Sequence, residues 1–415
     1  MRKNIVIGID GVPYELMALY MEEGLLPNLK KLAEKGTFQK TISSTPEVSS
    51  VAWSTIMTGA NPGEHGIFGF MELDQDYQIR FPDYTKLKKT PLWEGHKAAV
   101  VNLPASYPAP VLDGVLVAGF VAPDLARAVY PASLLAYLNS INYKVDVESQ
   151  LAVSDPKNFF AELEQVLKAR IQLIHELWDK EDWELFFAVF TGTDRLQHFF
   201  MDAFNNPEHP YFEHFKDYYK HLDEAVGSIL ARIGTGDKVT ILSDHGFGVL
   251  KQEVYLNYYL QKEEFLSFGT ARPEMISELD PNSKAFCLDP GRIYLNTQDR
   301  FPKARYKASD KELLESELIA SLQKLEIEGV KPITKILKRS DIYHGNECLQ
   351  APDLVLESLP GYDLKGIVGS NSLSGIRQFK GMHLKDNAFL ISSDPDLVLE
   401  KYDIENIGKL LKSYF

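Results

Sequence analysis

Short apolar runs recur along the chain and stop at polar residues. The first, Ile5 to Ile9 in NIVIGIDG, ends at an Asp-Gly pair, and similar runs occupy 98–104 and 114–120. Later runs in WELFFAVFTGTD and KVTILSDHG lead into Asp194 and Asp244. Continuous apolar runs of this kind are typical of strands that are buried on both faces of a parallel sheet.

Amphipathic helices are predicted between these strands. Leucines recur at helical spacing between Leu26 and Leu32, and Gly36 then occupies the C′ position after the helix. Longer helices are expected at 157–179 and 208–233. The alternation of strands with helices predicts an open α/β sheet.

The pattern becomes irregular after His245. Residues 251–345 combine a short strand, GRIYLN, with an acidic helix at 310–325, and we interpret them as an inserted cap subdomain. Two later runs, APDLVLE and NAFLISS, are expected to return as strands of the core. The predicted domains are therefore a core formed by 1–250 and 346–415, and an insertion at 251–345.

Composition and charge narrow the class of protein. The chain has 415 residues, 45% of them apolar and 25% charged, which is the composition of a globular protein with a large core. Its net charge of −14 argues against a nucleic acid polymer as a partner, because a phosphate backbone would be repelled. Cys287 and Cys348 lack CxxC spacing and are expected to be free, buried thiols. The first apolar run is too short for a signal peptide or a membrane span, so we expect a cytoplasmic protein without a membrane partner.

Acidic and histidine residues follow several of the predicted strands. In open α/β sheets, ligands bind beyond the carboxyl ends of the strands, so residues scattered in sequence can converge there. Each residue alone has an ordinary interpretation, such as a turn, a surface ion pair or a structural histidine. Together, three Asp and three His have the composition of a two-metal site for zinc, with manganese as the alternative. The six residues are Asp10, Asp194, His198, Asp244, His245 and His383.

A hydroxyl-rich segment, TPEVSSVAWSTIMTGANPGEHGIFGF, spans residues 45–70. We expect a helix at 50–58 with Ser49 at its N-cap, where the helix N-terminus favours a phosphate oxygen or an alkoxide. Ser54, Thr55 and Thr58 are interpreted as structural hydroxyls that bond to the helix backbone. Two divalent cations would balance three carboxylates and one deprotonated hydroxyl, so such a centre accepts an anionic phosphate without large repulsion.

Other hydrolase and nucleotide-binding motifs are missing from the sequence. It contains no GxSxG elbow and no GxxxxGK[ST] loop, which argues against a Ser-His-Asp hydrolase and a P-loop enzyme. Gly8 stands where a haloacid-dehalogenase-like chain needs its aspartate nucleophile.

With these residues assembled, the sequence resembles the alkaline phosphatase superfamily, and within it the type I phosphodiesterase/nucleotide pyrophosphatase branch and its predicted phosphohydrolase/phosphomutase relatives. The resemblance rests on five motifs in order: IGIDG, PEVSSVAWSTIMTGANPGEHGIFGF, TGTDRLQH, SDHGFG and GMHLKDN. It implies an alkaline-phosphatase-like α/β fold with an open mixed, mostly parallel sheet flanked by helices.

The resemblance also implies two metal sites and a nucleophile. One ion would be held by Asp10, Ser49, Asp244 and His245, and the other by Asp194, His198 and His383. Counting back from Thr58-Gly59 places the nucleophile on Ser49, with Ser50 as the second choice. Two departures, Ala52 for an Asn and Phe70 for the phosphoryl-binding Asn, weaken the case for nucleotide diesters as the substrate.

The predicted function is metal-dependent hydrolysis of a small phosphorylated substrate, of the phosphodiesterase/nucleotide pyrophosphatase kind, through a metal-activated Ser49 and a phosphoseryl intermediate. A phosphomutase or phosphomonoesterase of the same superfamily is one alternative, and a non-catalytic metal- or phosphate-binding protein is another. Four basic residues near the candidate ligands are interpreted as solvated surface groups. They are Arg195, Arg377, Lys380 and Lys385.

Overall fold

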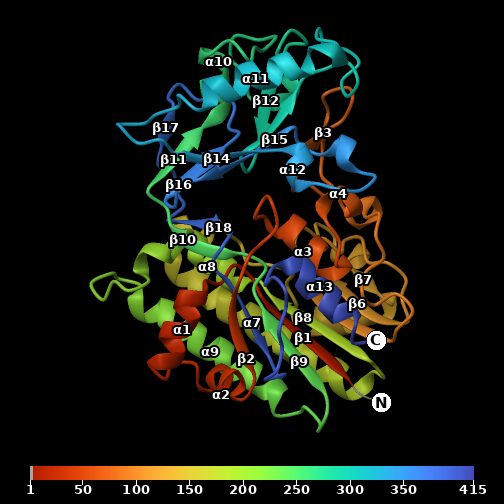
Figure 1. The fold of residues 1–415 in the computed structure, drawn as a ribbon. Helices are drawn as coiled ribbons and strands as arrows, with labels where there is room; N and C mark the ends of the chain where they lie inside the picture. Colours follow the sequence, from red (N-terminus) through yellow and green to blue (C-terminus); the bar gives the residue numbers. More distant parts are fainter. Residues whose placement is uncertain (1–2) are drawn as a thin grey trace. The chain divides into compact units, whose positions relative to one another are not determined.

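The computed structural model describes residues 3–415, which form two compact units (Figure 1). The first unit comprises the chain up to Ala60 together with Asp83–Gly248 and Gln378–Phe415. The second comprises Asn61–Pro82 and Val249–Arg377, so it contains the predicted insertion and extends beyond it at both ends. Within residues 3–415 no helix is long and apolar enough to cross a membrane.

Eight of the described strands form the central sheet of the first unit, in the order β2-β19-β9-β1-β8-β5-β6-β7. The five strands from β9 to β6 run parallel, whereas β2, β19 and β7 pair antiparallel at the two sides. The predicted mixed, mostly parallel sheet is therefore confirmed, and NAFLISS does return to the core as β19. The strands are β1 (Asn4–Ile9), β2 (Thr37–Thr41), β5 (Ala98–Leu103), β6 (Gly114–Ala118), β7 (Val129–Tyr130), β8 (Leu185–Phe190), β9 (Lys238–Leu242) and β19 (Ala388–Ser392).

Helices cover both faces of this sheet. Adjacent residues of β8 show it: Phe187 packs against Trp53 of α3, and Phe186 packs against Trp178 of α7. Because successive side chains of a strand point to opposite faces, α3 and α7 lie on opposite sides. The helices of this unit are α1 (Tyr14–Glu22), α2 (Pro27–Lys35), α3 (Ser49–Thr58), α5 (Leu135–Ser140), α6 (Leu151–Ser154), α7 (Pro156–Lys180), α8 (Gly192–Phe200), α9 (Phe212–Leu230) and α13 (Ile404–Lys412).

The helices predicted at 157–179 and 208–233 are confirmed as α7 and α9. Gly36 ends α2 as expected, but its φ is −125°, outside the left-handed region that the C′ prediction requires. The glycine is needed for another reason. A Cβ at this position would lie 1.8 Å from the main-chain oxygen of Ser392, where the chain passes close to β19.

The second unit is built around small sheets. Four strands pair in the order β12-β13-β15-β14, and three pair as β16-β11-β17. The strand predicted from GRIYLN and the helix predicted at 310–325 are confirmed as β13 and α11. The elements are β3 (Glu72–Leu73), β4 (Ile79–Arg80), β11 (Gln252–Tyr255), β12 (Ala285–Leu288), β13 (Arg292–Leu295), β14 (Ile333–Lys338), β15 (Leu354–Ser358), β16 (Tyr362–Lys365), β17 (Ser374–Gly375), α4 (Pro62–His65), α10 (Leu256–Lys262), α11 (Lys311–Leu322) and α12 (Arg339–Ile342).

Two sequence-based expectations for this unit are corrected. APDLVLE forms β15, which pairs with β13 and β14 rather than returning to the central sheet, and its Leu354 and Leu356 join the second unit's own apolar cluster. An apolar run predicts a buried strand but does not encode which sheet accepts it. Cys287 is a free buried thiol as predicted, whereas Cys348 is free but only partly buried.

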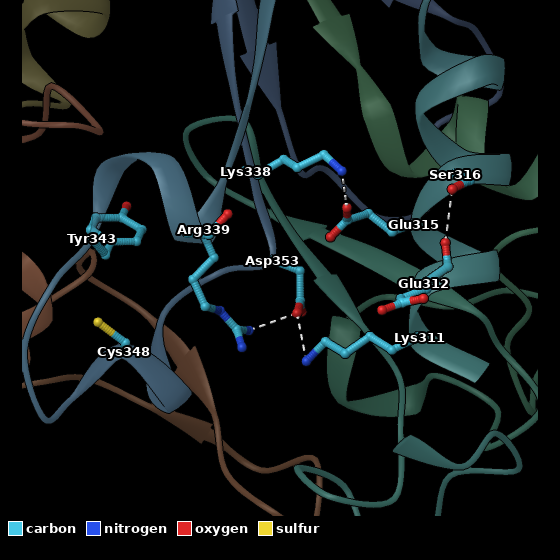
Figure 2. A pocket seen from close by; sticks show the side chains of 10 residues that line it. Lys311, Glu312, Glu315, Ser316, Lys338, Arg339, Tyr343, Cys348 and Asp353 are labelled. Carbon is cyan, nitrogen blue, oxygen red and sulfur yellow. Dashed lines mark hydrogen bonds and ion pairs between the residues drawn. The ribbon is translucent and has the colours of Figure 1, made fainter. Parts of the chain in front are cut away.

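A cavity of about 530 Å³ opens in the second unit beside α11 (Figure 2). Lys311 and Arg339 both reach the buried Oδ1 of Asp353, at 2.8 and 2.7 Å, and Lys338 pairs with Glu315 at 2.6 Å. Each of these three cations is therefore already matched by a carboxylate of the same unit.

Candidate metal centre and nucleophile

The three candidate acidic ligands follow three neighbouring parallel strands of the first unit. β1 runs directly into Asp10, β9 leads into Asp244, and β8 is followed by α8, which carries Asp194. Gly8 of β1 pairs in register with Val189 and Leu242, so the three strands end at the same edge of the sheet. The convergence predicted from the sequence is therefore present in the fold.

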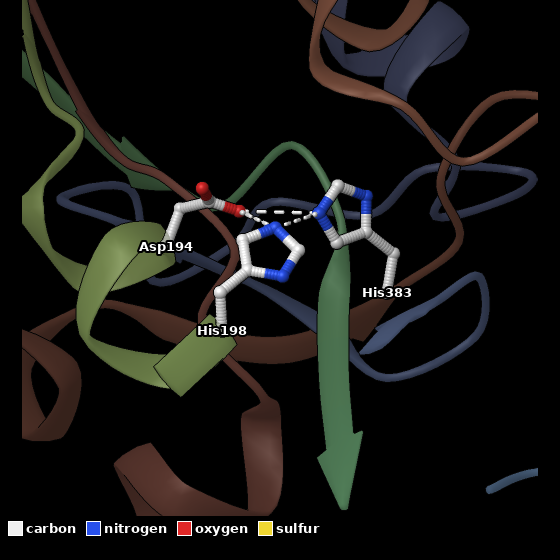
Figure 3. A group of neighbouring side chains, drawn as sticks. All are labelled: Asp194, His198 and His383. Carbon is white, nitrogen blue, oxygen red and sulfur yellow. Dashed lines mark hydrogen bonds and ion pairs between the residues drawn. The ribbon is translucent and has the colours of Figure 1, made fainter. Parts of the chain in front are cut away.

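Asp194, His198 and His383 form the first cluster of ligand-type side chains (Figure 3). Asp194 and His198 lie one turn apart on α8, and His383 comes from β18 (Gly381–Leu384), which pairs with β10 (Gly246–Val249). Asp194 Oδ1 lies 3.4 Å from His198 Nε2 and 3.2 Å from His383 Nε2, and the two Nε2 atoms are 3.1 Å apart. Three electron-pair donors thus face one another, as a metal ion requires.

The ring orientation of two histidines is set by main-chain carbonyl groups. His383 Nδ1 lies 2.9 Å from the oxygen of Glu47, and His245 Nδ1 lies 3.0 Å from the oxygen of Gly246. Because a carbonyl only accepts, Nδ1 donates in each ring, and Nε2 is the atom that can hold a metal ion once it carries no proton. Metal-binding histidines are held in this way, with the second nitrogen donating to a neighbouring oxygen.

Asp10, Asp194 and His245 form the second cluster, with ligand atoms that all lie within 4.8 Å of one another. His245 Nε2 is 3.6 Å from Asp10 Oδ1 and 3.4 Å from Asp244 Oδ2. Asp244 is positioned by the Gly11 N–H, which donates to its Oδ1 at 3.1 Å. Asp194 belongs to both clusters by distance, so the division of ligands between two ions stays a prediction.

Ser49 lies at the start of α3 and beside the second cluster. Its Oγ is 3.2 Å from His245 Nε2 and 3.5 Å from Asp10 Oδ1. The predicted N-cap role of Ser49 is wrong: the extended Val48 precedes the helix without a side-chain cap, and Ser49 is the first helical residue. Its hydroxyl is turned toward Asp10 and His245 instead of capping the backbone.

The other hydroxyls of this helix bond to their own backbone. Ser54 donates to the oxygen of Ser50, Thr55 to that of Val51, and Thr58 to that of Ser54, at 2.6 to 2.9 Å. Their predicted structural role is confirmed. Among the described residues, the buried Ser50 Oγ has no hydrogen-bond partner.

Burial concentrates negative charge at this site. Burial raises the pKa of Asp10 well above its usual value, and the charges of Asp244 and Asp194 raise it further. Burial likewise raises the pKa of Asp244 to about 7, although the hydrogen bond from the Gly11 N–H acts in the opposite direction and lowers this pKa. Burial also opposes ionisation of Asp194, but the charge of His198 and the hydrogen bond from His383 outweigh it and hold the pKa of Asp194 below its usual value. A bound cation would relieve the repulsion between these carboxylates.

Arg195 has a structural position that the sequence did not reveal. Its side chain is only 15% exposed, donates from Nη1 to Asp194 Oδ2 at 3.1 Å, and pairs with Asp146 at 2.8 Å. The solvated-surface interpretation is therefore wrong for Arg195. Arg377, by contrast, is half exposed and pairs with Glu253 in the second unit.

Two further side chains tie α8 to the loop after β1. Thr193 Oγ1 donates to the oxygen of Asp10 at 2.6 Å, and Gln197 Nε2 donates to the oxygen of Gly11 at 2.7 Å. Both residues lie near Asp194 in the motif TGTDRLQH. Their place in this motif is the only feature of the sequence that could have indicated their role.

A mostly parallel sheet with clustered Asp and His residues at its carboxyl edge, beside a helix that begins with a serine, defines the alkaline-phosphatase-like α/β class. The sequence model of the family described as type I phosphodiesterase / nucleotide pyrophosphatase matches residues 4–383, and the chain belongs to this family. Membership implies an enzyme class that hydrolyses phosphoesters with the help of metal ions. No curated protein matches the chain by sequence.

Solved structures share the fold at low sequence identity. Phosphonoacetate hydrolase from Sinorhizobium meliloti, in complex with phosphonoacetate, is 15% identical with a TM-score of 0.67, over 99% of this chain and 95% of that one. Murine ectonucleotide pyrophosphatase / phosphodiesterase 5, in an inactive form with AMP, is 14% identical with a TM-score of 0.58, over 100% and 95%. At such identities the likeness supports the fold alone.

Proposed function

We propose that this protein hydrolyses small phosphorylated substrates through Ser49, with the help of two divalent metal ions. The observation that carries the proposal is the position of Ser49 Oγ, 3.2 Å from His245 Nε2 and 3.5 Å from Asp10 Oδ1. The hydroxyl lies at the first residue of α3, where main-chain N–H groups without helical partners favour an anion.

The donor set fits metal ions. Buried Asp244 Oδ2 has no hydrogen-bond partner among residues 3–415, and the Nε2 atoms of His245 and His383 face carboxylate oxygens. Asp10, Asp244, His245 and Ser49 would hold one ion, and Asp194, His198 and His383 the other. Zinc suits these nitrogen and oxygen ligands, with manganese as the alternative. Bound divalent cations supply charge neutralisation and ease the loss of protons from a coordinated hydroxyl or water.

The chain's own residues perform the covalent chemistry. Ser49 Oγ forms a bond to phosphorus and passes its proton by way of solvent to the leaving-group oxygen, while the bond from phosphorus to that oxygen breaks. Water then attacks the phosphorus atom of the phosphoserine, the bond from phosphorus to Oγ breaks, and a proton of that water restores the Ser49 hydroxyl. The N-terminal end of α3 would stabilise the negative charge that develops on the phosphoryl oxygens.

The substrate is proposed to be a small phosphorus ester, with a diester as the first choice. Family membership favours a phosphodiester, whereas the neighbouring structures hold phosphonoacetate and AMP, two small anions that contain phosphorus. A monoester is the alternative within the superfamily, and a mutase would return the phosphoryl group to its substrate instead of to water.

A metal-reconstituted activity panel tests the proposal. Chelator-treated protein is loaded with Zn²⁺ or Mn²⁺ and assayed with p-nitrophenyl phosphate, bis-p-nitrophenyl phosphate, AMP and phosphonoacetate, for wild type, Ser49→Ala and Ser50→Ala. We expect metal-dependent release of product, lost on the order of 10³- to 10⁶-fold in Ser49→Ala and largely kept in Ser50→Ala. Full activity in metal-loaded Ser49→Ala would contradict the mechanism, and conversion of AMP to an isomeric phosphomonoester without release of inorganic phosphate would favour a mutase.

A further inference from the structure

We infer that Trp53 is a positioning residue that holds Asp10 in place as a ligand through one oxygen and ties it to the helix that carries Ser49. The inference rests on the proposed function, because it assigns Trp53 a role toward the metal cluster that contains Asp10. The residue lies at the centre of the hydroxyl-rich motif, SSVAWST, and neither the metal ligands nor the nucleophile account for it.

The indole nitrogen of Trp53 donates to the carboxylate of Asp10. Nε1 lies 2.9 Å from Oδ2, and both side chains are buried, with residue exposures of 0% for Trp53 and 2% for Asp10. The other oxygen, Oδ1, is the one that faces Ser49 Oγ and His245 Nε2. The hydrogen bond therefore divides the carboxylate into an anchored oxygen and an oxygen that remains available to a metal ion.

The backbone of β1 is shaped to admit this ring. A Cβ on Gly8 would lie 2.3 Å from Trp53 Cη2 and 3.0 Å from Val189 Cγ2, so the indole occupies the space that a side chain on β1 would fill. Phe187 of β8 meets the same ring edge-on, with centroids 6.1 Å apart. Packing on several sides keeps the indole in one position, and this position directs its N–H toward Asp10 Oδ2.

Trp53 and Ser49 lie on the same side of α3. They are four residues apart, which places them one turn from each other on one face of the helix. A single rigid element thus carries the nucleophile and the group that orients Asp10. Second-sphere donors of this kind typically change metal affinity or activity by about 10- to 100-fold when they are removed.

The chain offers a matched control in Trp183. It is also buried, with 1% exposure, but its Nε1 has no hydrogen-bond partner among the described residues. Trp183→Phe therefore removes the same atoms as Trp53→Phe without removing a bond to a candidate ligand. A purely structural role of Trp53 would make the two variants behave alike.

Zinc titration calorimetry on chelator-treated protein is the decisive measurement. In Trp53→Phe we expect one of two zinc-binding events to weaken by about 10- to 100-fold, while the event at Asp194, His198 and His383 changes little. We expect kcat to fall by a similar factor with a smaller change in KM, and Trp183→Phe to match wild type in both. Equal zinc affinities and kcat in Trp53→Phe and wild type would overturn the inference.

A spectroscopic signature separates this role from simple loss of packing. In protein labelled with ¹⁵N-tryptophan, the four indole N–H signals are assigned by substitution, and Zn²⁺ should shift the Trp53 signal but leave that of Trp183 in place. If Trp53→Phe does not fold, site-specific 3-benzothienylalanine at 53, which keeps the ring and lacks the N–H, should show the same loss of zinc affinity. An unmoved Trp53 signal, or an unchanged affinity in the isostere, contradicts the inference. A wild-type protein that neither binds zinc nor hydrolyses any ester would instead refute the proposed function, and the inference with it.

Discussion

His383 donates from Nδ1 to the main-chain oxygen of Glu47 at 2.9 Å, two residues before Ser49. A histidine near the C-terminal end of the chain is thereby linked to the loop that enters α3. Its Nε2 is left to face Asp194 and His198. One ring thus connects a candidate metal cluster with the segment that leads to the proposed nucleophile.

Removing this ring should weaken the cluster of Asp194 and His198 and disturb the entry to α3. For His383→Ala we predict at least about a 100-fold loss of zinc affinity at that cluster, since a proposed ligand is lost outright together with its orienting hydrogen bond. Calorimetric titration with Zn²⁺ measures it. The control is His175→Ala, which removes a partly buried histidine of α7 that hydrogen-bonds to Ser228 of α9 rather than to a candidate ligand. Equal losses in both variants would contradict the prediction.

Arg195 should contribute more to stability than an exposed arginine does, because its ion pairs are largely buried. Arg195→Met removes the guanidinium that pairs with both Asp146 and Asp194 in a largely buried setting, and we predict a loss of about 3–5 kcal/mol in the free energy of unfolding. Denaturant titration of the chelator-treated protein measures it. The matched variant Arg232→Met breaks an exposed pair with Asp179 and should cost less than about 1 kcal/mol. A loss below 1 kcal/mol in Arg195→Met as well would show that the carboxylates do not depend on this cation.

The stability of the metal-free protein should depend on pH through the ionisation of Asp244. Its pKa is raised from 3.8 to about 7 by burial, so the folded state binds the proton more tightly than the unfolded state does. The free energy of unfolding that Asp244 contributes therefore falls by up to about 1.4 kcal/mol per pH unit as the pH rises from about 4 to about 7. Above about pH 7 this contribution stays constant. Asp244→Asn removes this dependence and keeps an oxygen for the Gly11 N–H. We predict that the variant gains stability relative to wild type across that window, which unfolding curves at several pH values will reveal. A difference that is constant with pH would contradict the assigned shift.

Metal ions should reverse the order of stability of wild type and Asp244→Asn. With zinc at about 100 times the dissociation constant, wild type should gain about 2.7 kcal/mol for each site that binds only the folded state. Asp244→Asn should gain less, because a neutral amide is a poor ligand in place of a carboxylate. Thermal melts with and without a chelator measure both proteins at the same pH. If the variant stays more stable than wild type in excess zinc, Asp244 is not a ligand.

The sequence by itself determined the strands, the main helices and the set of residues that converge. The apolar runs that end near Asp10, Asp194 and Asp244 predict buried parallel strands, and parallel strands place their carboxyl ends at one edge, so the candidate site follows from local patterns. The ordered motifs predicted the family for the same reason, because they record which residues follow each strand.

Only the tertiary structure decided how the convergent residues are held. Which oxygen of Asp10 is anchored depends on Trp53, which approaches from another element through the space above Gly8. Arg195 became buried because Asp146 and Phe120, distant in sequence, surround it. β15 joined the second unit because its partners lie there. Hydrophobic patterns encode burial and local period, whereas these outcomes depend on which distant segments meet, and no local pattern carries that information.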